Sequence, residues 1–168
     1  MRNKTLCIGF KGKNNSSALL VSALSPRHCL LTNSFAGLRK DVEELSPDYE
    51  EVWLFGVDKS LVDSIRIEGV AEKDGVLRST TLDMEDLAAR FSGAGLKATV
   101  ASHPTKYFCN EAYWHLLGKY AGKAVLIHLP TIKHFEEEWI SKVKEASRSV
   151  WLITCKGRAG HEIQSSHL

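Results

Sequence analysis

Short apolar runs rich in β-branched residues alternate along the chain with stretches whose apolar positions recur at helical spacing. The apolar runs predict strands at residues 5–10, 28–33, 51–57, 64–71, 97–101 and 124–129. The helical spacing predicts helices at residues 16–24, from a Ser34 cap to residue 45, and at residues 83–91, 107–120 and 134–155. Gly93 and Gly95 are expected to close the third of these helices.

Strands that alternate with helices favour an α/β fold. We therefore predict a three-layer α/β/α sandwich around a largely parallel (mixed) central sheet. The chain has 168 residues, and domains contain roughly 150 residues each, so residues 1–168 are expected to form a single domain. A chain of this length buries roughly 70% of its unfolded surface and needs no metal or disulfide to stabilise a core.

The charge pattern argues against a polyanionic partner. Twenty-two basic and 20 acidic residues leave a net charge of +2, and the basic residues are scattered along the chain. We therefore expect no nucleic-acid partner. No apolar run approaches the roughly 18 residues of a membrane span, and the N-terminal run is too short for a signal peptide. These features predict a cytoplasmic protein that does not bind membranes.

The sequence contains neither a metal-binding motif nor a cofactor-binding motif. It has no H-E-x-x-H pair and no phosphate-binding glycine loop, so we expect no metal and no cofactor. The four cysteines lack metal-knuckle spacing, and the default interpretation of each is a small buried hydrophobic residue. They are Cys7, Cys29, Cys109 and Cys155.

Three chemically useful residues stand where predicted elements end or begin. Glu68 closes the segment SIRIE, His128 nearly ends the run AVLIHL, and Cys109 lies in the first turn of its helix. Functional groups of α/β sheets gather at the carboxyl ends of strands and at the starts of the following helices. Peptide dipoles at a helix start favour a thiolate, which with an imidazole and a carboxylate forms a nucleophilic triad.

Each of these residues also has a structural interpretation. Cys109 belongs to an apolar helical stripe that continues through Tyr113 to Tyr120, so it is also a candidate core residue. Glu68 alternates with apolar neighbours, as a solvated charge on a half-buried strand would. His128 fits an interior histidine whose hydrogen bonds are satisfied. The pattern alone leaves both interpretations open.

Five segments in matching order resemble the pyroglutamyl peptidase I (pyrrolidone-carboxylate peptidase) family. Residues 107–113 (YFCNEAY) resemble its "YLCN" segment, and residues 126–130 (LIHLP) its "FIHVP" segment. Residues 65–71 (IRIEGVA) are similar to "I-x-x-E-R-x-A". Near the N-terminus, residues 8–10 (IGF) resemble "TGF", and residues 15–17 (NSS) resemble "NPS".

The resemblance implies a role for each matched residue. Cys109 would be the nucleophile that attacks the amide after an N-terminal pyroglutamate, His128 its general base and acid, and Glu68 the residue that orients His128. Phe10 would be one aromatic wall of the pocket for the lactam ring. Arg78 lies ten residues after Glu68, as does an active-site arginine of the family, and its alternative is an ordinary surface arginine.

The sequence departs from the family pattern around the substrate. The family turn "F-x-P-F-G-G" is shortened after Phe10, so the second aromatic wall is missing and Lys13 stands in its place as a candidate substrate-binding residue. Gly69 replaces an arginine, Lys73 an asparagine, and residues 104–105 (PT) a small Ala-Gly pair. Loss of one apolar wall removes substrate contact worth about 1–3 kcal/mol. The triad can persist without this contact, whereas specificity for pyroglutamate depends on it.

Three hypotheses follow from these observations. The first is a short, divergent cysteine peptidase that removes pyroglutamate from N-terminally blocked peptides. The second keeps the triad but acts on another small acyl-amide or ester, because Lys13 suits an anionic or open-chain acyl group. The third is a non-catalytic homologue that binds a small ligand or partner. Family members commonly self-associate, which leaves a homo-oligomer open for this chain.

Overall fold

The computed structural model describes residues 5–158, with side chains through residue 148. Its strands are β1 (Thr5–Phe10), β2 (His28–Leu31), β3 (Glu51–Val57), β4 (Ser64–Glu68), β5 (Val70–Lys73), β6 (Val76–Ser79), β7 (Lys97–Ala101) and β8 (Ala124–Leu129). Its helices are α1 (Ser16–Leu24), α2 (Phe35–Glu44), α3 (Met84–Gly93), α4 (Tyr107–Lys119) and α5 (Glu138–Arg158).

The central sheet has six strands in the order β2-β1-β3-β8-β4-β7. Strands β2, β1, β3 and β8 are parallel, whereas β4 pairs antiparallel with β8 and carries β7 parallel to itself. Every residue of β8 is buried, as expected for a central strand covered on both faces. The sheet is therefore mixed and largely parallel, as predicted.

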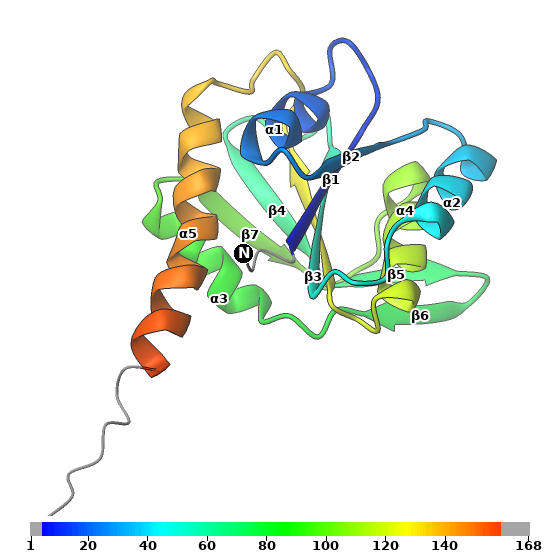
Figure 1. Cartoon of the computed structure of the whole chain (residues 1–168). Helices are drawn as coiled ribbons and strands as arrows, with labels where there is room; N and C mark the ends of the chain where they lie inside the picture. Colours follow the sequence, from blue (N-terminus) through cyan, green and yellow to red (C-terminus); the bar gives the residue numbers. More distant parts are fainter. Residues whose placement is uncertain (1–4, 159–168) are drawn as a thin grey trace, which may run out of the picture.

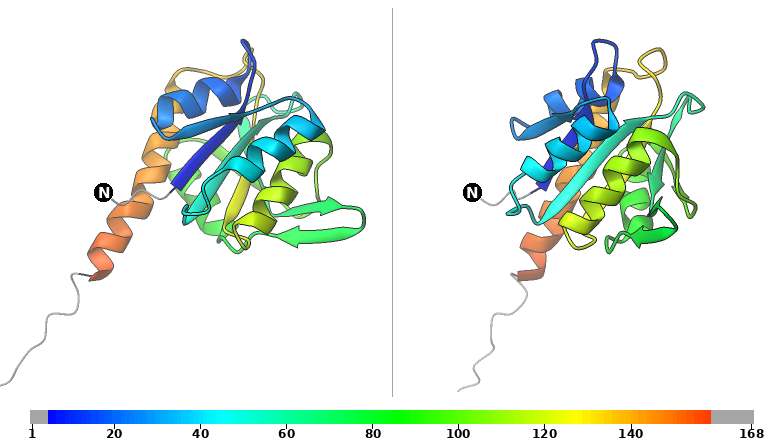
Figure 2. Two further views of the ribbon diagram at one scale, coloured as in Figure 1. Left: turned by 45° about the vertical axis from the view of Figure 1, so that its right-hand side comes forward. Right: turned by 90° about the vertical axis from the view of Figure 1, so that its right-hand side faces the viewer.

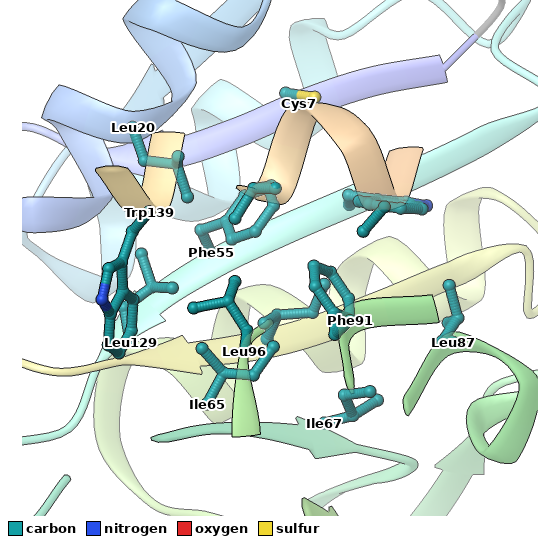
Figure 3. Close-up of a cluster of buried hydrophobic side chains, with 14 of the residues drawn as sticks. Cys7, Leu20, Phe55, Ile65, Ile67, Leu87, Phe91, Leu96, Leu129 and Trp139 are labelled. Atoms are coloured by element: carbon teal, nitrogen blue, oxygen red, sulfur yellow. The ribbon is translucent and has the colours of Figure 1, made fainter. Parts of the chain in front are cut away.

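Helices cover both faces of this sheet, which confirms the three-layer prediction (Figure 1). On one face, α1, α3 and α5 contribute Leu20, Phe91 and Trp139 to a cluster that also holds Phe55 of β3 (Figure 3). On the other face, a second cluster contains buried residues of α2 and α4 together with apolar residues of β1, β3 and β8. The predicted cap of α2 is present, because the Ser34 side chain accepts a hydrogen bond from the Gly37 N–H.

One predicted strand is in fact two. The run 64–71 breaks at Gly69, and its second part pairs with β6 as an antiparallel hairpin beside α4 (Figure 2). Asp74 and Gly75 form the turn, with φ angles of 50° and 77° that suit a tight hairpin. The sequence pattern missed β6 because the strand is short and largely exposed, so it lacks an apolar face.

The final helix also differs from its prediction. It begins at Glu138 rather than near His134. The intervening residues make a turn in which the N–H groups of His134 and Phe135 both donate to the Thr131 carbonyl. The apolar periodicity of the α5 sequence extends back into this turn, because Phe135 is buried in the same cluster as the helix.

Candidate active site

His128 lies in the middle of a row of residues that crosses three strands. Gly56 of β3 is its partner on one side and Arg66 of β4 its partner on the other. Side chains at matched positions of neighbouring strands point to the same face, which here is the face covered by α2 and α4. The row therefore places an imidazole beside a residue with no side chain and beside an arginine.

Glu68 reaches His128 diagonally across the antiparallel pair. It is matched with Leu126, two residues before His128, and its Oε1 lies 2.8 Å from His128 Nδ1. Glu68 is 1% exposed and His128 2% exposed, so the interpretation of Glu68 as a solvated charge is wrong. Because an ionised carboxylate only accepts hydrogen bonds, Nδ1 donates to it, and the neutral tautomer with this proton has its lone pair on Nε2.

The position of Glu68 was only partly foreseen. We expected it at the carboxyl edge of the sheet, but β4 runs antiparallel to β8, so Glu68 lies toward the start of β8. Burial disfavours ionisation of Glu68, but the hydrogen bonds from His128 and Arg66 outweigh it and hold the pKa of the carboxyl below its usual value.

Cys109 and His128 border the space left by Gly56. A Cβ on Gly56 would lie 2.6 Å from Cys109 Sγ and 3.2 Å from His128 Nε2. The Cys109 thiol and the Cδ2–Nε2 edge of the His128 ring therefore border the same small volume above β3. The structure brings Cys109, His128 and Glu68 together, although they come from α4, β8 and β4.

Helix α4 is held in place by the same stripe that made Cys109 a core candidate. Tyr113, Leu116, Leu117 and Tyr120 are buried in the cluster on this face, and Cys109 packs partly buried at its edge. The Tyr113 hydroxyl donates a 2.8 Å hydrogen bond to the Glu68 carbonyl, which ties α4 to β4. The stripe is thus both a core element and the reason that Cys109 points into the site.

The start of α4 has an unusual backbone. Tyr107 adopts a left-handed φ of 65° and is 80% exposed. Among the described residues, no side chain caps this helix start. The first N–H groups of a helix lack intrahelical partners, so the turn that contains Cys109 offers free donors beside the thiol.

Burial opposes ionisation of the Cys109 thiol. Burial, with a smaller contribution from the carboxylates of Asp58 and Glu68, raises the pKa of the thiol to about 11 against the opposing effect of a hydrogen bond with the Val57 backbone. Desolvation therefore opposes the thiolate that the start of the helix would favour.

An arginine and an aspartate that the sequence analysis did not select complete the charge network. Arg66 Nε donates to Glu68 Oε1 at 2.6 Å, and its Nη2 donates to Asp58 Oδ2 at the same distance. Asp58 follows directly after β3, and its N–H bonds the Leu129 carbonyl. A charged residue directly after a strand that is apolar from Val52 onward was the signal for Asp58, and the alternation of Arg66 with Ile65 and Ile67 was the signal for Arg66.

The three predicted substrate-binding residues lie in different places. Phe10 ends β1 and is 4% exposed within the cluster that Cys109 borders. Lys13 is exposed in the connection between β1 and α1. Arg78 lies on β6, where its guanidinium stacks 3.4 Å from the Trp114 ring and donates to the Trp114 carbonyl.

The structure does not bring Arg78 to the triad. Its guanidinium packs beside Gly118, nine residues beyond Cys109 and therefore roughly 13 Å farther along α4. Its contacts fix the β5–β6 hairpin to the helix. Within residues 5–158, no helix is long and apolar enough to cross a membrane, and no group of three His, Cys, Asp or Glu residues is arranged to hold a metal ion.

Comparisons with known proteins identify the fold. No family model and no curated protein matches the sequence. Pyrrolidone carboxyl peptidase from Thermococcus litoralis superposes with a TM-score of 0.72 at 18% identity, over 97% of this chain and 100% of that one. The enzyme from Thermus thermophilus gives 0.70 at 16% identity, over 86% and 96%. The enzyme from Pyrococcus furiosus gives 0.69 at 14% identity, over 91% and 98%.

These values show that the chain has the fold of pyrrolidone carboxyl peptidases. The fold implied by the sequence resemblance is thereby confirmed. At such low identity the similarity reaches the fold and no further, so chemistry is argued from the site itself.

Proposed function

We propose that this protein is a divergent member of the pyroglutamyl peptidase I family, a cysteine hydrolase that removes N-terminal pyroglutamate from peptides. One observation carries the proposal. Glu68 orients His128 through Nδ1, so that Nε2 and the Cys109 thiol share the space above Gly56. A nucleophile, a base and a group that orients the base are the parts that acyl transfer requires.

The protonated resting thiol determines the first step. Burial raises the pKa of the Cys109 thiol to about 11, well above neutral pH, so spontaneous thiolate is scarce. His128 Nε2 therefore takes the Sγ proton as Sγ bonds to the carbonyl carbon of the scissile amide. Glu68 stabilises the imidazolium that forms, and the free N–H groups at the start of α4 face the developing oxyanion.

The second half of the reaction returns the site to its starting state. The imidazolium protonates the amide nitrogen as the C–N bond breaks, which releases the shortened peptide and leaves a thioester on Cys109. His128 then removes a proton from water, which attacks the thioester carbonyl. The acid product leaves, and the proton returns to Sγ.

A turnover assay with matched cysteine variants tests the proposal. Wild-type protein should hydrolyse a fluorogenic pyroglutamyl amide, and Cys109→Ala should abolish turnover. Cys29→Ala removes another free, partly buried thiol on the same face of the sheet and should retain activity. Undetectable hydrolysis by folded wild-type protein at high enzyme concentration, or equal rates in wild type and Cys109→Ala, would contradict the proposal.

A second candidate function keeps the triad but changes the acyl group. Phe10 is almost fully buried, whereas Lys13 is exposed in the connection that follows it. This distribution favours an anionic or open-chain acyl group over an apolar lactam. A panel of acyl amides, with Cys109→Ala as the blank, separates the two candidates, and a preference for anionic acyl groups that Lys13→Glu abolishes would support the second.

A further inference from the structure

Arg66 forms a bridge across the strand that carries His128. Its Nε bonds Glu68 on its own strand, and its Nη2 bonds Asp58 beyond β3 on the far side of β8. The same Nη2 lies 3.5 Å from His128 Nδ1. The guanidinium therefore spans β4, β8 and the end of β3 over the imidazole.

The bridge affects both partners of the Glu68–His128 hydrogen bond. Glu68 Oε1 accepts from Arg66 and from His128 at once, which fixes the orientation of the carboxylate. A guanidinium is suited to join two carboxylates in this way because its donors form a rigid fork. Its positive charge also lies beside the imidazole, where it opposes gain of a second proton.

The charged and titratable groups around this imidazole come from three elements. Glu68 and Arg66 of β4 contact its Nδ1 side, and the Cys109 thiol of α4 lies near its Nε2 side. Asp58 after β3 and the Tyr113 hydroxyl of α4 belong to the same network through their bonds to Arg66 and to the Glu68 carbonyl. Among these described groups, Arg66 is the cation, and it is tied to both carboxylates. Loss of Arg66 would leave two anions near His128 without their counter-charge.

We propose that Arg66 is a positioning residue that holds Glu68 and His128 in the productive arrangement and sets the pH below which the site loses its base. Asp58 anchors the guanidinium from the opposite side. The proposal rests on the function proposed above for the triad. It concerns a residue that acts through Glu68 and His128 and does not itself touch the reacting atoms.

The test measures the rate of Cys109 alkylation as a function of pH. This rate depends on proton transfer from the thiol to the imidazole and does not require substrate turnover. Iodoacetamide labelling is followed by peptide mass spectrometry, which separates Cys109 from Cys7, Cys29 and Cys155. Arg66→Met should move the acid midpoint of the alkylation rate upward by about one pH unit, because the imidazolium becomes more stable when the neighbouring cation is lost. Arg66→Lys restores the charge and should bring the midpoint back toward the wild-type value.

A variant of opposite sign and a distant control complete the experiment. Asp58→Asn removes an anion near the imidazole and should move the midpoint downward, so the proposal remains testable if Arg66→Met fails to fold. The control is Lys97 of β7, the other strand that pairs with β4, where the lysine forms an exposed ion pair with Asp63. Lys97→Met removes this cation and should leave the pH profile of Cys109 alkylation unchanged.

The outcomes separate this proposal from the proposed function. A folded Arg66→Met protein whose profile superimposes on the wild-type profile would overturn the positioning role, as would shifts of the same sign in Arg66→Met and Asp58→Asn. Absence of pyroglutamyl amide hydrolysis by wild-type protein would instead contradict the proposed function, whatever the alkylation profiles show.

Discussion

Gly56 is the residue whose replacement tests the geometry of the site most sharply. It lies on β3 directly beside His128, and its missing side chain provides the space that Cys109 and His128 share. A Cβ in Gly56→Ala would lie 2.6 Å from Sγ, whereas ordinary contacts fall between 3.4 and 4 Å. The thiol must therefore move by about 0.8 Å or more, which changes its position relative to Nε2.

The expected result is a loss of activity larger than the loss of stability. Misplacement of a reacting group by about 1 Å can reduce a rate by about 10²-fold. In Gly56→Ala, kcat/KM should therefore fall by about that factor on the acyl amide that the wild-type protein hydrolyses. Overpacking of a core position usually destabilises a protein by about 1–3 kcal/mol, so the variant should remain folded at 25 °C. Steady-state kinetics and thermal unfolding on the same preparation measure both effects.

Gly93→Ala is the matched control. Gly93 ends α3, and no atom lies within 4 Å of the position that its Cβ would take. This variant should retain full activity. Wild-type kcat/KM and wild-type alkylation kinetics in Gly56→Ala would refute the reasoning, because the thiol and imidazole would then not share the volume above β3.

Three further predictions concern Glu68, Asp58 and Arg78. Glu68→Gln should reduce kcat by roughly 10³–10⁴-fold in steady-state assays, because an amide no longer enforces the tautomer with its proton on Nδ1; a loss below tenfold would contradict the orienting role. Both Asp58 and Glu68 have a pKa below the ordinary value in the folded chain, so their stabilising contribution is present above about pH 4.5 and is lost as pH falls through the folded pKa values. The free energy of unfolding, measured with denaturant, should therefore decline on acidification, and the decline should be shallower in Asp58→Asn than in wild type. Parallel pH dependences in the two proteins would contradict this prediction. Arg78→Ala should speed hydrogen exchange in β5–β6 and reduce stability by about 1–2 kcal/mol without changing KM, whereas a raised KM would assign Arg78 to the substrate.

The fold could be predicted well where each segment has one strong periodicity. The run of β8 is apolar at nearly every position because both faces of the strand are buried, and this gives an unambiguous signal. The hairpin was missed because β6 packs one edge against α4 and leaves Val76 and Leu77 exposed. Strand direction was also inaccessible, since nothing in the segment SIRIE distinguishes a parallel from an antiparallel partner.

The candidate site was predictable in its residue types but not in its charge network. Cys109, His128 and Glu68 could be selected because each stands at an element boundary and matches a family segment. The bridge from Arg66 to Asp58 depends on register across three strands, which no local pattern reveals. The pKa of the Cys109 thiol likewise depends on burial by distant segments, which raises it and which no local pattern at the helix start reveals.

Trapping of the covalent intermediate tests the central claim most directly. Wild-type protein is mixed with excess pyroglutamyl amide, quenched with acid within one turnover, and digested for peptide mass spectrometry. We predict an acyl adduct on the peptide that contains Cys109, and no adduct on any peptide of Cys109→Ala. Product release with no dependence on Cys109, or an adduct that forms equally on Cys29, would contradict the assignment of Cys109 as the nucleophile.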